Sequence, residues 1–341
     1  TDFPFQLNVV MDDEKVVLDE ISINNGENPA NKIIRKAIDN KSNNTDKFKE
    51  YTSSFYSRGL FKVKNAPEKI LGQRLGDLGG GLDSTRTGII YLSETVSEIT
   101  FQKKPAEFKE KIIASKVSGS DNGISFNRAE EANFDFYSNA VLIAENNLVS
   151  PISDNAFRYY RYELEGSFYD KNGRLINKIK VNPKRSRDRV FSGFIYIVEE
   201  DWAIYGVDLK ASGEQVGIPI IEVLKFKQDY NYSESNKAWI KISQIIDFKF
   251  GLFGFNVDGR FSGAYSDYNF SPKFKKETFS NEVLSFAKGA TEKDSLFWEN
   301  LRPVPLTSEE KNDYVLKDSI KEIRKSKKYL DSLDKKNNPI K

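Results

Sequence analysis

The feature that most constrains the fold is a series of strand-like stretches joined by very short turns in the second half of the chain. Aromatic residues make up 13% of the sequence, and such residues pack well on half-buried strands. Asn172-Gly173 is a strong hairpin signal, because both residues tolerate the positive φ of a type I′ turn. Parallel strands would need crossovers of a dozen residues or more, so the short turns predict an antiparallel meander. The predicted strands are 158–169, 174–182, 190–199, 202–209, 219–231, 237–250, 252–264 and 265–270.

The first half of the chain gives mixed signals. Asn28 and Pro29 supply a helix cap and a first helical residue, and an apolar stripe with helical spacing follows as far as Asn40. Other segments have weaker patterns. They are a hairpin over 3–23, a strand pair at 55–56 and 60–63, a glycine-rich loop over 72–84, one or two strands over 88–101, a helix over 105–117 and a short helix over 134–143.

Two helices are predicted to close the chain, over 290–301 and from Thr307 to about Asp334. Thr307 and Glu310 have the spacing of a capping box. Cations on the second helix invite comparison with a membrane-facing basic helix, but acidic residues interleave with them, which favours an ordinary solvated helix. The fold class predicted from all these elements is α+β: a large curved antiparallel sheet, a meander or half-barrel, with a few flanking helices.

The absent residue types narrow the chemistry. The 341 residues include no Cys and no His. Thiolate and imidazole metal sites, Cys nucleophiles and serine–histidine–acid triads are therefore excluded. The net charge of +2 provides no long-range attraction for nucleic acid. We expect a non-enzymatic protein without a cofactor or a metal site and without a nucleic-acid partner; paired carboxylates are the main remaining route to catalysis.

Two segments are candidate binding sites. The first is a predicted hairpin end with four cations, which fits the binding of lipid phosphate or other anions and equally fits a solvated turn. Its residues are Lys184, Arg185, Arg187 and Arg189. The second is a stretch taken as one strand with apolar residues on both faces, typical of a strand buried on both sides or of an apolar contact site. Its residues are Phe250, Leu252, Phe253, Phe255 and Val257.

Several motifs, taken in order along almost the whole chain, resemble an uncharacterised outer-membrane family of Bacteroidota. In that family a carboxypeptidase-regulatory-like β-sandwich precedes this region and a β-barrel follows it. The motifs are Asn28–Ile38, Leu92–Thr95, Asn177–Arg185, Val190–Ile197 and Arg302–Thr307.

The resemblance implies a placement and an organisation. Residues 1–24 would be the last strands of a truncated sandwich, 25–150 a mixed helix and strand region, 151–285 the antiparallel sheet domain, and 286–341 C-terminal helices leading towards a barrel. The expected location is the periplasmic face of the bacterial outer membrane.

The leading functional hypothesis is a periplasmic scaffold that presents a sheet surface to a protein or lipid partner, beside the β-barrel of the same parent chain. The architecture also resembles the half-open barrels of periplasmic lipoprotein carriers, so a lipid or lipoprotein carrier is one alternative. A carboxylate-dependent envelope glycan hydrolase is the other.

Overall fold

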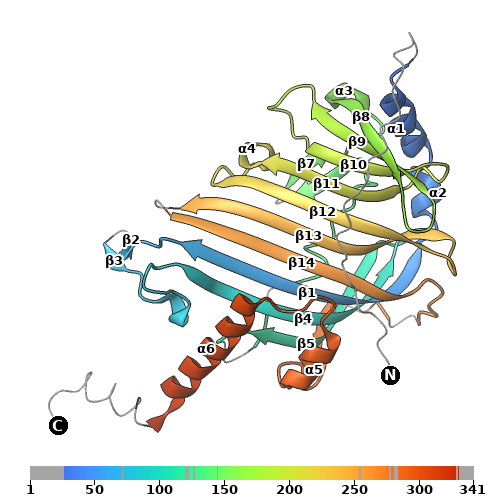
Figure 1. Ribbon diagram of the computed structural model, residues 1–341. Coiled ribbons are helices and arrows are strands. Elements are labelled where there is room, and N and C mark those ends of the chain that lie inside the picture. Colours follow the sequence, from blue (N-terminus) through green and yellow to red (C-terminus); the bar gives the residue numbers. More distant parts are fainter. Residues whose placement is uncertain are drawn as a thin grey trace.

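The computed structural model describes residues 27–329, apart from 71, 120–122, 126, 144, 253–254, 276–277, 280–282 and 328. One large, open, curved sheet dominates the molecule, with helical segments packed against both of its faces (Figure 1). The predicted fold class, α+β with a large antiparallel sheet, is confirmed. The hairpin predicted over residues 3–23 lies outside the described residues.

Eleven strands form the sheet. They are β1 (Glu50–Lys64), β4 (Gly88–Gln102), β5 (Glu107–Val117), β8 (Tyr160–Tyr169), β9 (Leu175–Pro183), β10 (Ser192–Val198), β11 (Ile204–Ser212), β12 (Ile221–Ser233), β13 (Ala238–Leu252), β14 (Phe255–Asn269) and β15 (Leu284–Phe286). Two short ribbons stand apart from it: β2 (Lys69–Ile70) with β3 (Gln73–Arg74), and β6 (Ala140–Ile143) with β7 (Asn146–Val149).

The order of the strands is β15-β5-β4-β1-β14-β13-β12-β11-β10-β9-β8. The strands from β8 to β14 form the predicted meander. The early strands β1, β4 and β5 continue the same sheet beyond β14, because β1 pairs antiparallel with β14 over most of its length. The sheet therefore includes strands from both sides of residue 150. Only β15 runs parallel to its neighbour, β5, among the described strands.

Helical segments are short except for two. They are α1 (Pro29–Asp39), α2 (Lys41–Thr45), η1 (Leu78–Gly80), α3 (Ala156–Tyr159), α4 (Gly213–Val216), α5 (Ser295–Leu301) and α6 (Ser308–Lys325). Asn28 caps α1 through a hydrogen bond from the Ala30 amide, as predicted. Thr307 and Glu310 form the predicted capping box of α6. No helix in the described part of the chain is long and apolar enough to cross a bilayer.

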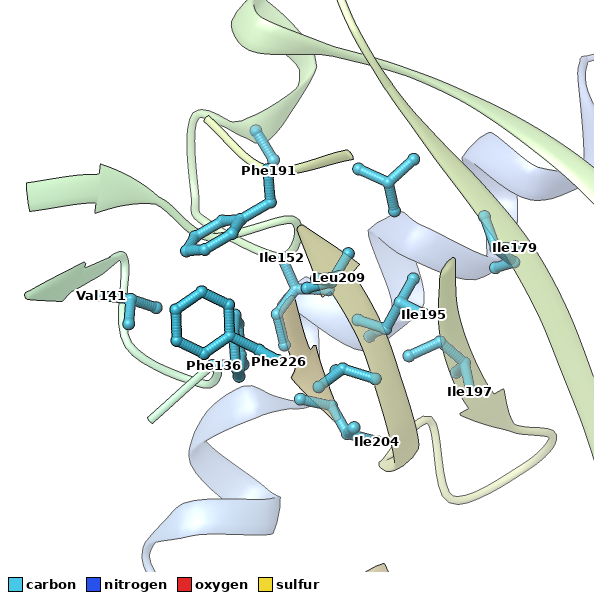
Figure 2. Packing of buried hydrophobic residues seen from close by; sticks show 14 of the residues in the cluster. Phe136, Val141, Ile152, Ile179, Phe191, Ile195, Ile197, Ile204, Leu209 and Phe226 are labelled. Carbon is cyan, nitrogen blue, oxygen red and sulfur yellow. The ribbon is translucent and has the colours of Figure 1, made fainter. Parts of the chain in front are cut away.

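The main hydrophobic core lies on one face of the sheet, here called the inner face. Residues 127–156 cross this face, and α1 packs beside them. Figure 2 shows Phe136 from the crossing segment beside Phe191 and Phe226, with ring centroids 5.3 and 6.2 Å away in edge-to-face arrangements. Aliphatic side chains of β9, β10 and β11 pack beside these rings in the same cluster. The chain thus covers the inner face of its own sheet.

The predicted helix over 105–117 is wrong, since this segment is the strand β5. Its apolar residues Phe108, Ile112 and Ile113 have a spacing that fits a strand as well as a helix. Phe108 and Ile112 are four residues apart, so they lie on the same face of the strand, and Ile113 follows on the other face. Ile112 is buried, and Ile113 packs in a separate cluster around Trp298.

Two other predictions in the first half were also wrong. Residues 134–143 form turns and β6 rather than a helix, because the Asp135 side chain accepts hydrogen bonds from Tyr137 and Ser138 in a local turn. The strand pair at 55–56 and 60–63 is one continuous strand, β1, through Gly59. A Cβ atom on Gly59 would lie 2.6 Å from Oδ1 of Asn127, so a glycine is needed where the crossing segment meets the sheet.

The C-terminal helices cover the opposite, outer face of β1, β4 and β5 (Figure 1). Trp298 of α5 is buried against Tyr56, Val96 and Ala114. Helix α5 begins at Ser295 rather than near residue 290, because Asp294 caps it by accepting from the Phe297 amide. Helix α6 ends at Lys325, earlier than predicted; residues 330–341 lie outside the described residues.

Candidate interaction surface

The apolar segment from Phe248 to Val257 is a hairpin, not one strand. β13 ends at Leu252 and β14 begins at Phe255, with these two residues opposite each other in the register. The apolar residues fall on both faces in the sequence pattern because two strands contribute them. Phe253 lies outside the described residues, as do the side chains of Leu252 and Phe255.

The other two residues of this predicted site pack together. Phe250 and Val257 are paired across the hairpin. Val257 is buried against Val63 and Ala66, and Phe250 packs at the margin of the same cluster. Side chains from the loop that contains η1 cover this cluster: Leu75, Leu78 and Leu82. The base of the hairpin is therefore part of a small core.

The four predicted cations lie in the loop between β9 and β10, and all are exposed. Two of them have partners: Lys184 donates to the Phe157 carbonyl at 2.6 Å, and Arg185 pairs with Asp188 at 3.1 Å. The side chains of Arg187 and Arg189 make no ion pair or hydrogen bond with any described residue. These two guanidinium groups are available to an external anion.

The structure brings the basic loop and the apolar hairpin to the same end of the sheet. A short chain of contacts joins them through the β11–β12 connection. Gln215 of α4 donates to the Ser186 carbonyl at 3.1 Å, and the Gly251 amide donates to the Ile220 carbonyl at 3.3 Å. Ile220 is 52% exposed between them. We call this surface, formed by residues 184–191, 213–220, 249–252 and 255–258, the hairpin end.

A buried charge network on the outer face was missed by the sequence analysis. Glu94, in the middle of β4, is fully buried and accepts two hydrogen bonds from Arg302, each at 2.7 Å. The Tyr56 hydroxyl donates to the same carboxylate at 2.6 Å. Burial alone would raise the pKa of Glu94, but the hydrogen bonds from Arg302 and Tyr56 outweigh it, so the pKa is lowered. One signal was present in the sequence: an acidic residue in the middle of a segment predicted to be a strand.

Arg58 extends this network to α6. Its guanidinium pairs with Glu310 at 3.2 Å and also donates to the carbonyls of Val304 and Pro305. Burial opposes the charge of Arg58, but the adjacent Tyr56 and Glu310 raise its pKa. The connector between α5 and α6 is therefore fixed to the sheet through its backbone carbonyls as well as through Arg302.

Helix α6 buries charged side chains and exposes apolar ones. Its buried residues are Glu310, Asp313, Tyr314 and Lys317, and Lys317 donates to the Ile89 carbonyl at 2.8 Å. On the other side of the helix, Val315, Leu316 and Ile323 are 68%, 51% and 60% exposed. The sequence pattern of α6 predicts an ordinary solvated helix. Its interleaved charges instead include those that attach it to the sheet.

An open groove of about 710 Å³ lies between α6 and the end of β5. Charged side chains of both signs line it: Lys116, Lys293, Lys321, Asp318 and Glu322. A second cavity, of about 220 Å³, lies beside β5 and is lined by Ile112, Arg128 and Phe286, among others. No group of three or more acidic side chains able to hold a metal ion occurs in the described part of the chain.

The protein is thus an open, curved antiparallel sheet whose inner face is covered by residues 127–156 and α1 of the same chain. The chain belongs to a family of unknown function, DUF5686, whose model matches residues 33–268. No curated protein matches the sequence.

Solved structures that match this chain share about a tenth of their residues with it. A LolA superfamily protein from Nitrosomonas europaea is 10% identical, with 74% of this chain and 97% of that chain covered and a TM-score of 0.26. A DUF1329 family protein from Desulfovibrio piger is 9% identical, with 75% and 98% covered and a TM-score of 0.27. The Pseudomonas aeruginosa MucA/MucB complex matches at 9% identity, with 73% and 98% covered and a TM-score of 0.20. TM-scores this low carry no functional argument.

Proposed function

We propose that this chain is a non-enzymatic interaction scaffold on the periplasmic side of an outer-membrane protein, and that the hairpin end is its contact surface. The observation that carries the proposal is the filled inner face. Phe136, Leu148 and Ile152 of the crossing segment are fully buried against the sheet. The surface left for a partner is therefore formed by the ends, the edges and the outer face.

This packing favours a scaffold over a lipid carrier. A site for a drug-sized ligand typically needs about 300 to 1,000 Å³ with mostly apolar walls. The cavity beside β5 has about 220 Å³. The larger groove beside α6 is open and lined by charged groups. Val257, one of the residues expected to line an acyl site, is instead packed against Val63.

The two most buried carboxylates are engaged in internal contacts, which supports a non-enzymatic role over a glycan hydrolase. Glu94 is held by Arg302 and Tyr56. Glu110 accepts hydrogen bonds from the Ser97 hydroxyl at 2.7 Å and the Ala129 amide at 3.0 Å. Burial, the largest effect, raises the pKa of Glu110. A glycosidase acid needs such a raised pKa, but it also needs access to the substrate and a second carboxylate across a cleft.

The hairpin end combines the two kinds of group that an envelope contact uses. Arg187 and Arg189 supply uncompensated positive charge, and Ile220 supplies exposed apolar surface. Arginine is enriched in the energetically dominant part of protein interfaces, and clusters of basic side chains also suit anionic lipid headgroups. The periplasmic placement rests on the family resemblance of the sequence motifs.

Site-specific photo-crosslinking in the full-length protein in intact cells tests the proposal. The crosslinker replaces Arg187 or Ile220 at the hairpin end. The control position is Lys171, which is also exposed, in the β8–β9 turn at the opposite end of the sheet. We expect one adduct of common mass from positions 187 and 220 and none from position 171. Protein and lipid adducts differ in mass, so the experiment also identifies the class of partner. Absence of an adduct at both hairpin positions, or equal labelling at all three, would overturn the proposal.

A further inference from the structure

We infer that α6 is an interfacial helix that lies on an anionic phospholipid bilayer through Val315, Leu316 and Ile323. The inference goes beyond the proposed scaffold function. It concerns a surface separate from the hairpin end and stands whether or not that end binds a partner.

The first observation is the orientation of α6. Its sheet-facing residues Glu310, Asp313, Tyr314 and Lys317 recur at intervals of three and four, so they form one face of the helix. A helix packed on a globular protein normally turns its apolar stripe to the core and its charges to water. In α6 the arrangement is reversed, since Val315 is 68% exposed and Ile323 60% exposed.

The second observation is that the orientation is fixed. Glu310 is bound to Arg58, and Lys317 is bound both to the Ile89 carbonyl and to Asp313, at 2.8 and 2.7 Å. A rotation that buried the apolar stripe would carry these charged groups away from their partners. It would also leave Arg58 inside the protein without its carboxylate, which is costly. The network therefore holds the apolar stripe towards the outside.

Charge identifies the occupant of this face. From Lys321 to Lys327, in the last turns of α6 and just after them, the chain carries four cations and one anion, whereas the whole chain has a net charge of only +2. The last turn of α6 includes Arg324 and Lys325. An exposed apolar stripe joined to a basic segment is the pattern of helices that lie in the plane of an anionic membrane surface.

A second copy of the chain is a poorer fit. An 18-residue helix is about 27 Å long at a rise of about 1.5 Å per residue. Three apolar side chains along that length cover far less than the roughly 800 Å² per partner that a stable interface buries. Insertion among lipid headgroups needs no matching protein surface, and the basic segment adds electrostatic attraction.

The test uses the 341-residue chain and vesicles of phosphatidylcholine with a quarter phosphatidylglycerol, with pure phosphatidylcholine vesicles as the neutral comparison. We expect co-sedimentation with the anionic vesicles that weakens with salt. Leu316→Asp should reduce the affinity at least about tenfold, because it places a charge in the apolar stripe. Leu142→Asp is the matched control. Leu142 is 60% exposed on β6, far from α6, and its substitution should leave binding unchanged.

A fluorescence measurement separates insertion from mere charge attraction. The chain has no cysteine, so Val315→Cys and Leu142→Cys each provide one position for an environment-sensitive dye. The dye at position 315 should shift to the blue with anionic vesicles, and the dye at position 142 should not. Salt-sensitive binding without a shift at 315, no binding at all, or full binding by Leu316→Asp would each overturn the inference. Loss of binding in Arg187→Glu/Arg189→Glu but not in Leu316→Asp would assign the lipid contact to the hairpin end and exclude α6.

Discussion

Glu94 and Arg302, which are 208 positions apart in the chain, form a two-point salt bridge on the outer face of the sheet. Both charges are almost completely removed from water. The pair joins the middle of β4 to the connector that leads into α6. The position of the C-terminal helices on the sheet thus depends on one buried carboxylate and the groups that donate to it.

Removal of Arg302 should destabilise the fold strongly. Arg302→Met would leave Glu94 buried without its counter-charge, which typically costs about 3 to 5 kcal/mol in the free energy of unfolding. Urea unfolding measures this change. The control is Arg185→Met, which removes an exposed pair with Asp188 and should change stability by no more than about 0.5 kcal/mol. A loss below about 1 kcal/mol in Arg302→Met would show that the network contributes little.

The buried Glu94 carboxylate should also make the free energy of unfolding depend on pH. The native pKa of Glu94 lies below its ordinary value of 4.5, so the unfolded chain binds protons more readily as the pH falls past that value. The stabilisation is present above the ordinary pKa and is lost as the pH falls through the lower native pKa. Unfolding of wild type and Glu94→Gln between pH 6 and pH 3 should therefore show a gap that narrows with acid. A gap that does not depend on pH would contradict this account.

Two buried serines on β4 should respond in opposite directions to substitution. The Ser93 hydroxyl has no hydrogen-bond partner among the described residues, so Ser93→Ala is expected to be neutral or stabilising. Ser97 donates to Glu110, and Ser97→Ala would remove a donor from a buried carboxylate at a cost of about 1 to 3 kcal/mol. Thermal unfolding of the two variants gives the comparison. Equal losses would indicate that Ser93 has a partner, such as an ordered water molecule.

Lys241 should destabilise the native state at neutral pH. It lies on β13 beside Asn133 and the Tyr265 ring, and burial lowers its pKa from 10.5 to about 8. Between these values the unfolded chain holds the proton more tightly, so stability rises with pH over that interval. Lys241→Met should stabilise the protein by about 1 to 3 kcal/mol at pH 7.

That advantage of Lys241→Met should shrink as the pH approaches 10.5, and urea unfolding at several pH values would measure it. Lys225→Met, at an exposed lysine of β12, controls for the loss of a charge. A stabilisation that stays constant with pH would rule out the burial of the ammonium group as its cause.

The meander could be predicted because its information is local. Short turns such as Asn172-Gly173 specify which strands are neighbours, and the strands from β8 to β14 follow in that order. The pairing of β1 with β14 could not be predicted, since no local signal connects residues so far apart in the sequence. The helix expected at 105–117 failed for another reason: the spacing of Phe108, Ile112 and Ile113 fits a strand, where residues four apart share a face, as well as a helix.

For the candidate sites, too, one part could be predicted from the sequence and another part could not. Composition alone pointed to the basic loop around Arg187 and to the apolar hairpin around Phe250. Their meeting at one end of the sheet depends on contacts of α4 with the loop and of Ile220 with the hairpin, and single-sequence patterns do not encode these. For α6, the number and signs of the charges could be read from the sequence. Which of them face the sheet was set by Arg58 and by the Ile89 carbonyl, on distant strands.

Because β1 pairs with β14, the sheet cannot be completed until β14 has been synthesised. As the chain emerges from the ribosome, β1, β4 and β5 are complete long before residue 255 appears, and throughout that interval β1 presents an open edge. Unpaired edges invite association with other chains, and contacts between distant segments form slowly. Of the two strands that flank β1 in the sheet, β4 can pair with it early, whereas β14, the last strand of the meander, is synthesised much later. A chain that terminates between β5 and β14 would therefore expose the edge of β1 and tend to aggregate, and it would not form a smaller stable domain.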